Sequence, residues 1–203
     1  MIAVQQGLKF GPSDHGRAVT EEELAIAEYS EGYKYEIIDG GLYVSPVPNL
    51  PEAFLDDWLY GKLYEYVRTH SNVVNYLNDK ARVYLPDRDD VTIPEPDIAV
   101  YKDFPTGKLI RDLNWSEISP LIVVEILVDS DPEKDLVRNV DLYHQVPSIA
   151  EYWILDGREN CDEPLLIARR RYGSRWLLQE VPYCEIYRTP TLPGFELLID
   201  PRK

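Results

Sequence analysis

Cysteine and histidine are scarce in this chain of 203 residues. The only thiols are those of Cys161 and Cys184, and their separation does not match the spacing of metal-ligand motifs. Two such thiols are typical of proteins from a reducing compartment, so we expect a cytoplasmic location and no structural disulfide. The three histidines also lack ligand spacing, which argues against a zinc site.

Long hydrophobic runs are absent as well. No segment approaches the roughly 20 apolar residues that a transmembrane helix needs, so we expect a soluble protein that does not act at a membrane. Residues 1–14 have neither a charged segment nor a long apolar core, and we expect no secretory signal there. The chain also contains no glycine-rich phosphate loop and no G-x-S-x-G motif.

Basic residues are also few relative to acidic ones. The chain has 36 acidic against 21 basic residues, a net charge of −15. Because Lys and Arg contacts to phosphates supply most of the nonspecific affinity for nucleic acids, this balance argues against broad, tight DNA binding. A local basic patch or a metal ion could still serve a nuclease. The densest basic cluster is Arg169–Arg171, which we interpret as an exposed strand edge whose charges oppose aggregation.

Length and composition favour one domain over residues 1–203, because no linker, repeat or low-complexity tract is present. A capping-box sequence predicts a short helix within residues 20–29. Residues 35–44 contain two β-type runs around Asp39-Gly40-Gly41, a pattern that predicts a hairpin.

The central part of the chain combines helical and strand patterns. Apolar residues at three- and four-residue steps predict a long helix over residues 51–69. Shorter β-type runs predict three strands, at 73–77, 81–85 and 98–101.

A β-α-β pattern follows. Residues 120–128 are almost continuously apolar, as in a strand buried on both faces. Ser130, Pro132 and Glu133 predict the start of a second helix. Residues 152–156 predict another buried strand, so we expect a right-handed βαβ unit with at least partly parallel pairing. The remaining residues predict hairpins that extend the sheet.

Two carboxylates are the strongest candidates for chemistry. Glu125 lies within an apolar run, where an ionised carboxylate is costly unless it is paired, hydrogen-bonded or bound to a cation. The alternative is a glutamate at a strand end, with its carboxylate in water or on an arginine. Asp97 follows Pro96, which suits an edge or bulge that re-aims the next side chain. On neighbouring strands the two would repel each other unless they held a divalent cation such as Mg²⁺.

At this point the sequence resembles a known family. It looks like the bacterial restriction endonuclease-like family, long catalogued as a domain of unknown function, within the PD-(D/E)XK nuclease superfamily. The matching segments, in order and spacing, are YEIIDG (35–40), EPDIAV (95–100), LIVVEIL (121–127), Asp135, Tyr143, EYWILD (151–156) and LPGF (192–195). The resemblance covers most of the chain. It implies an α/β fold with a restriction-endonuclease-like core: a mixed central sheet flanked by helices, with an N-terminal hairpin and a C-terminal strand extension.

The resemblance also implies roles for individual residues. Asp97 would be the aspartate of the PD element, and Glu125 the acidic residue of the (D/E)XK element. Together with the backbone carbonyl of Ile126, they would bind Mg²⁺ or Mn²⁺. The superfamily's habits further imply a homodimer.

Two supporting groups of the family are missing. Leu127 stands where the motif has its lysine, and Asn139 stands at the position on the following helix to which this family typically moves that lysine. An amide carries no charge that could offset a developing negative charge. Arg138 is the neighbouring cation that could reach the site, although it hardly deprotonates. By alignment, Glu52 replaces a histidine near the start of the first long helix.

These observations leave three hypotheses. The first is a metal-dependent nuclease that hydrolyses phosphodiester bonds, with Asp97, Glu125, Arg138 and Asn139 at its catalytic site and chemistry impaired by the missing lysine. The second is a non-catalytic nuclease-fold protein that acts as a binding or regulatory homodimer. The third, a metal-dependent hydrolase of another substrate, would explain the acidic charge but has no motif behind it.

Overall fold

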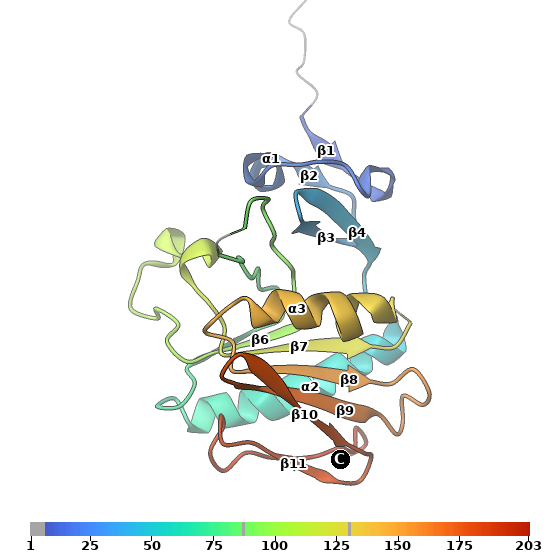
Figure 1. The fold of residues 1–203 in the computed structure, drawn as a ribbon, viewed down its shortest axis with the longest axis vertical. Coiled ribbons are helices and arrows are strands. Elements are labelled where there is room, and N and C mark those ends of the chain that lie inside the picture. The colour runs from blue at the N-terminus through green and yellow to red at the C-terminus, as the bar shows by residue number, and fades with distance from the viewer. Residues whose placement is uncertain (1–6, 87, 130) are drawn as a thin grey trace, which may run out of the picture. The chain divides into compact units, whose positions relative to one another are not determined.

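The computed structural model describes residues 7–86, 88–129 and 131–203, drawn as a ribbon in Figure 1. The chain forms two compact units. The first contains the residues up to Val47 together with Tyr84–Glu95, and the second contains Pro48–Val83 and Pro96–Lys203. None of the described helices is long and apolar enough to cross a membrane.

The first unit is built around the predicted hairpin. Its elements are β1 (Lys9–Phe10), η1 (Pro12–Asp14), α1 (Glu21–Ile26), β2 (Glu28–Tyr29), β3 (Tyr33–Ile38) and β4 (Gly41–Pro46). Strands β3 and β4 pair antiparallel, and the two residues between them, Asp39 and Gly40, both have positive φ, at 49° and 72°. This is the type I′ geometry that an Asp-Gly turn favours. The predicted capping box is also present, because Thr20 and Glu23 exchange hydrogen bonds at the start of α1.

The second unit contains the central sheet. Its helices are α2 (Leu50–Thr69), η2 (Ile110–Asp112), η3 (Trp115–Glu117), the π-helical turn η4 (Lys134–Arg138) and α3 (Asn139–His144). Its strands are β5 (Tyr76–Asn78), β6 (Ile98–Tyr101), β7 (Ile122–Leu127), β8 (Glu151–Asp156), β9 (Leu165–Tyr172), β10 (Arg175–Val181), β11 (Ile186–Arg188) and β12 (Glu196–Leu198).

The sheet is mixed, as predicted. Six strands run in the order β10-β9-β8-β7-β6-β5, and only β7 and β8 are parallel. The helical segment between β7 and β8 completes the predicted β-α-β unit, and β9 and β10 extend the sheet as a hairpin. Strands β11 and β12 instead pair with each other in a separate two-stranded ladder.

Two strand predictions need correction. Residues 81–85 form no strand, although Ala81 and Val83 are buried as an alternating pattern predicts. Val83 is the last residue of its stretch in the second unit and Tyr84 begins a stretch of the first, so the run is divided between two units instead of forming one strand. Only the second half of the run at 73–77 is a strand, since β5 begins at Tyr76. The predicted helix cap at Ser130 lies outside the described residues, and Asp131 accepts the backbone N–H of Glu133 instead.

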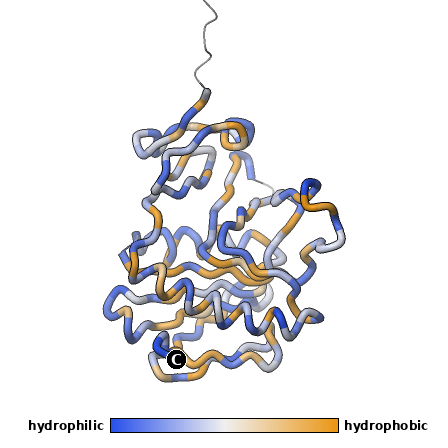
Figure 2. The backbone as a smooth tube through the Cα atoms, turned by 180° about the vertical axis from the view of Figure 1, so that it is seen from behind, coloured by the Kyte–Doolittle hydropathy of each residue, from blue (hydrophilic) through white to orange (hydrophobic). Residues whose placement is uncertain are grey.

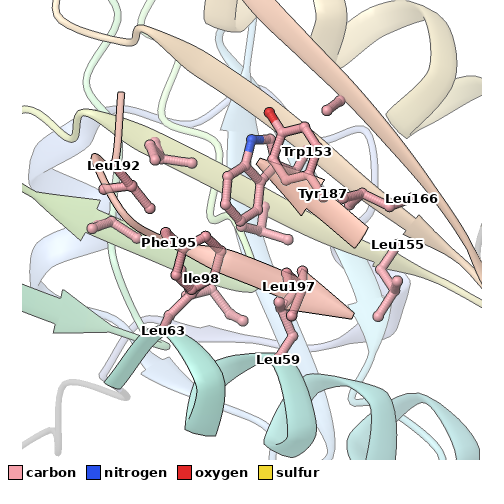
Figure 3. Close-up of a cluster of buried hydrophobic side chains, with 14 of the residues drawn as sticks. Leu59, Leu63, Ile98, Trp153, Leu155, Leu166, Tyr187, Leu192, Phe195 and Leu197 are labelled. Atoms are coloured by element: carbon pink, nitrogen blue, oxygen red, sulfur yellow. The ribbon is translucent and has the colours of Figure 1, made fainter. Parts of the chain in front are cut away.

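One face of the sheet packs on α2. Leu55, Leu59 and Leu63 of this helix are fully buried against Ile98 and Trp153 in the largest hydrophobic cluster. Figure 3 shows this cluster, to which Tyr187, Leu192, Phe195 and Leu197 from the C-terminal segment also contribute. The hydropathy colouring of Figure 2 shows the hydrophobic character of the central strands. Because side chains alternate across a strand, Glu125 points to the opposite face from Val124 and Ile126 of this cluster.

Gly157, directly after β8, offers a test of this packing. A Cβ added there would lie 2.8 Å from Leu55 Cδ1 and 3.4 Å from the Cα of Cys161. Because Leu55 is fully buried, it has little room to move away. We expect Gly157→Ala to destabilise the protein by about 1–3 kcal/mol, the usual effect of overpacking a core. Chemical denaturation measures this. Gly107→Ala is the matched control, because a Cβ there meets nothing within 4 Å, and an equal loss in both variants would contradict the packing argument.

Candidate active site

Glu125 lies on β7 of the second unit, and Asp97 directly precedes the neighbouring strand β6. Ile98 of β6 pairs with Val124 of β7, and continuing this antiparallel register by one residue places Asp97 opposite Glu125. Directly opposed residues have Cβ atoms about 4.5–5.5 Å apart. The backbone N–H of Ile126 donates to Asp97 Oδ2 at 2.7 Å, which fixes the aspartate against β7. Asp97 and Glu125 are therefore close together, and the charges of both contribute to the raised pKa of Tyr152.

Both carboxylates are buried. Asp97 is 6% exposed and Glu125 is 1% exposed. Two donors contact the same oxygen of Glu125, Oε1: Asn139 Nδ2 at 2.9 Å and the Tyr143 hydroxyl at 2.8 Å. Glu125 is thus neither at a strand end in water nor without partners.

The helical segment over this face begins with a π-turn. The backbone N–H of Asn139 donates to the carbonyl of Lys134, five residues earlier. In an α-helix the acceptor would be the carbonyl four residues earlier. In this wider turn Asn139 Nδ2 also donates to Asp135 Oδ1 at 3.1 Å. Asp135 is as deeply buried as Glu125, so one amide bridges two buried carboxylates. Single π-turns within helices are frequent at functional sites.

Tyr152 of β8 lies at the centre of this group. Its hydroxyl donates to the backbone carbonyl of Asp135 at 2.8 Å. Burial raises the pKa of Tyr152 well above its ordinary value, and the charges of Glu125 and Asp135 raise it further. The phenol therefore stays protonated and remains a donor to the π-turn. The guanidinium of Arg169 lies 6.0 Å from the centre of the Tyr152 ring, within cation–π range.

The interpretation of Arg169–Arg171 as an exposed strand or hairpin edge is wrong, although these residues do lie in the β9–β10 hairpin. These residues belong to β9, which lies between β8 and β10, and all three are half-buried. Arg171 donates to the backbone carbonyls of Tyr143, Val146 and Ile149, and so caps the C-terminal end of α3. Arg171 thus holds the end of the helix that carries Asn139 and Tyr143. Sequence spacing alone could not reveal this, because the acceptors lie 22–28 residues away.

The other residues singled out in the sequence are placed as follows. Arg138 is half-buried and donates from Nε to Asn139 Oδ1 at 3.1 Å, so it contacts the residue that contacts Glu125. Ile126 contributes its N–H to Asp97. Leu127 is fully buried, and it provides no charge at the position of the motif's lysine. Sequence reasoning missed the roles of Tyr152 and Arg169, for which no local motif exists.

The comparisons with known proteins identify the family and the fold. The family model Uma2, described as "Putative restriction endonuclease", matches residues 21–200. The chain belongs to this family. A search of curated proteins found no match.

A solved structure shows the same fold as this Uma2 member. It is a crystal structure titled as a "putative nuclease belonging to DUF820" from Anabaena variabilis, with a TM-score of 0.67 and 15% sequence identity. The match covers 89% of this chain and 95% of the other. The predicted restriction-endonuclease-like fold is thereby confirmed.

Proposed function

We propose that this Uma2 protein is a metal-dependent nuclease of low activity that hydrolyses phosphodiester bonds of DNA. The observation that carries the proposal is the opposed pair Asp97 and Glu125, with Asn139 bonded to Glu125 where the family has a lysine. The pair supports metal binding, and the neutral amide supports slow chemistry. The net charge of −15 supports weak rather than tight contact with nucleic acid.

The residues present fit Mg²⁺ or Mn²⁺. Two carboxylates and the backbone carbonyl of Ile126 form a set of hard oxygen donors. No group of three or more His, Cys, Asp or Glu side chains arranged for a metal occurs among the described residues. Mg²⁺ sites commonly use one or two carboxylates and keep several waters, so a third acidic ligand is not required.

Each residue has a distinct task in this proposal. Asp97 and Glu125 would hold the ion, and a bound ion would supply an activated water and neutralise phosphoryl charge. The Ile126 N–H orients Asp97. Asn139 and Tyr143 orient Glu125 through Oε1. Removing such partners of a metal ligand typically lowers metal affinity 10–100-fold.

A second candidate function is a non-catalytic nuclease-fold protein that acts as a binding or regulatory homodimer. The observation that favours it is the loss of both lysine positions, because Leu127 and Asn139 are uncharged. Plasmid cleavage separates the two candidates. Mg²⁺-dependent nicking that disappears in Asp97→Ala supports the nuclease, whereas no cleavage above that of Asp97→Ala supports the binding protein.

Metal binding can be tested apart from activity. We expect Mg²⁺ or Mn²⁺ to raise the melting temperature of the wild type and to leave Glu125→Gln unchanged. An ion present at 100 times its dissociation constant adds about 2.7 kcal/mol of stability, which differential scanning fluorimetry detects easily. If no ion shifts the wild type, and Glu125→Gln is the more stable protein without metal, the pair is an unoccupied relic of a nuclease site.

A further inference from the structure

All hydrogen-bonding groups of the Asn139 side chain are used, and each contacts a charged residue. Its Nδ2 donates to Glu125 Oε1 at 2.9 Å and to Asp135 Oδ1 at 3.1 Å. Its Oδ1 accepts from Arg138 Nε at 3.1 Å. The amide therefore lies between one guanidinium and two carboxylates, in a position where it is fully buried.

This chemistry allows only one orientation of the amide. An arginine can only donate hydrogen bonds, and an ionised carboxylate can only accept them. Rotating the Asn139 amide by 180° would place its oxygen against Glu125 and Asp135 and its N–H groups against Arg138. The positive end of the amide dipole consequently faces the carboxylates, and the negative end faces the guanidinium. Hydrogen-bond chains of this kind polarise one another, most of all in a buried setting.

The three residues of this arrangement belong to the π-turn or directly follow it. Asn139 and Asp135 both direct their side chains to the buried face, while Arg138, the preceding residue, reaches Asn139 Oδ1 from a half-buried position. A half-buried charge is screened less by solvent and salt than an exposed one. The charge of Arg138 is therefore one amide away from Glu125 and Asp135.

We propose that Arg138 and Asn139 together take over one task of the missing lysine, the stabilisation of the buried carboxylates: Asn139 provides the hydrogen bonds to Glu125 and Asp135, and Arg138 provides the positive charge behind the amide. The inference rests on the proposed function and names the residues that balance the negative charge of its site. Arg138 is a positioning residue, because it acts through Asn139. In the metal-free protein, the positive charge of Arg138 stabilises the two carboxylates. The same charge weakens the binding of a divalent cation.

A double-mutant cycle without metal tests the pairing. We expect Arg138→Met to lower the melting temperature on the order of 4 °C. In the Asn139→Lys background, where a lysine already provides the charge, the same change should have almost no effect. Arg138→Lys should retain most of the wild-type stability. Arg111→Met is the matched control for net charge, because the Arg111 side chain is 82% exposed. Equal losses in both backgrounds, or no loss in either, would overturn the proposal.

Calorimetric titration with Mn²⁺ gives a readout that mere structural damage would not produce. Arg138→Met should bind Mn²⁺ roughly tenfold more tightly than the wild type, because a nearby positive charge is gone. Damage to the fold would weaken binding instead, and weaker or unchanged binding contradicts the proposal. If the wild type binds no Mn²⁺, the metal part of the proposed function fails, and the metal-free cycle still decides the role of Arg138.

Discussion

Replacing Asn139 with lysine should raise Mg²⁺-dependent DNA cleavage by about a hundredfold. Asn139 Nδ2 already contacts Glu125 and Asp135, so a lysine ammonium reaching the same place would donate to both carboxylates and add a full charge. A single well-placed group that stabilises transition-state charge contributes about 10²–10³ in rate. The measurement is the nicking rate of supercoiled plasmid at saturating Mg²⁺.

The controls for this prediction separate charge from size. Asn139→Met has a similar length to lysine but no charge, and we expect it to give no gain. Asn139→Lys should also bind Mn²⁺ more weakly than the wild type, because the new ammonium repels the ion. A lysine variant that folds with an unchanged melting temperature and still shows wild-type cleavage would mean that the missing lysine does not limit this protein.

Local patterns were sufficient to predict the scaffold. The Asp39-Gly40 turn, helix α2 and strand β7 each follow from a short-range rule: turn chemistry, a helical apolar period and a continuous apolar run. Asp97 and Glu125 could be paired from the sequence because Asp97 directly precedes, and Glu125 lies within, two adjacent buried strands. Predicting that these two carboxylates are neighbours required no knowledge of contacts between distant parts of the chain.

The rest depends on contacts that no local pattern contains. The sequence of the π-turn, Lys134–Arg138, looks like that of an ordinary helix. Its hydrogen bond from the Asn139 N–H to the Lys134 carbonyl is compatible with burial of both Asp135 and Asn139. Arg171 looks like a surface charge in the sequence, yet its acceptors are carbonyls at the far end of α3. Residues 81–85 have the right alternation for a strand but find no partner strand. Local propensity therefore predicts most of the elements, whereas tertiary packing determines the π-turn, the missing strand and the polar contacts.

Glu151 also makes contacts with distant parts of the chain. Replacing it should destabilise the protein more than any change in the active site. Its carboxylate is fully buried and accepts four hydrogen bonds. The donors are Trp153 Nε1 at 2.7 Å, the Tyr187 hydroxyl at 2.8 Å and the hydroxyls of Thr189 and Thr191. Three of the four come from the C-terminal segment, so Glu151 joins that segment to β8.

A graded series of variants tests this role. Glu151→Met should cost about 5 kcal/mol, because it leaves several buried donors unpaired at roughly 1–3 kcal/mol each. This lowers the melting temperature by about 10–20 °C. Glu151→Gln should lose about half as much, since the threonine hydroxyls can turn to accept from its amide. Glu117→Gln, which removes an exposed charge beside Lys108, should change little. If only packing mattered at this position, Glu151→Met would be the milder change. A lower melting temperature for Glu151→Met than for Glu151→Gln therefore supports the hydrogen-bonding role, and the reverse order contradicts it.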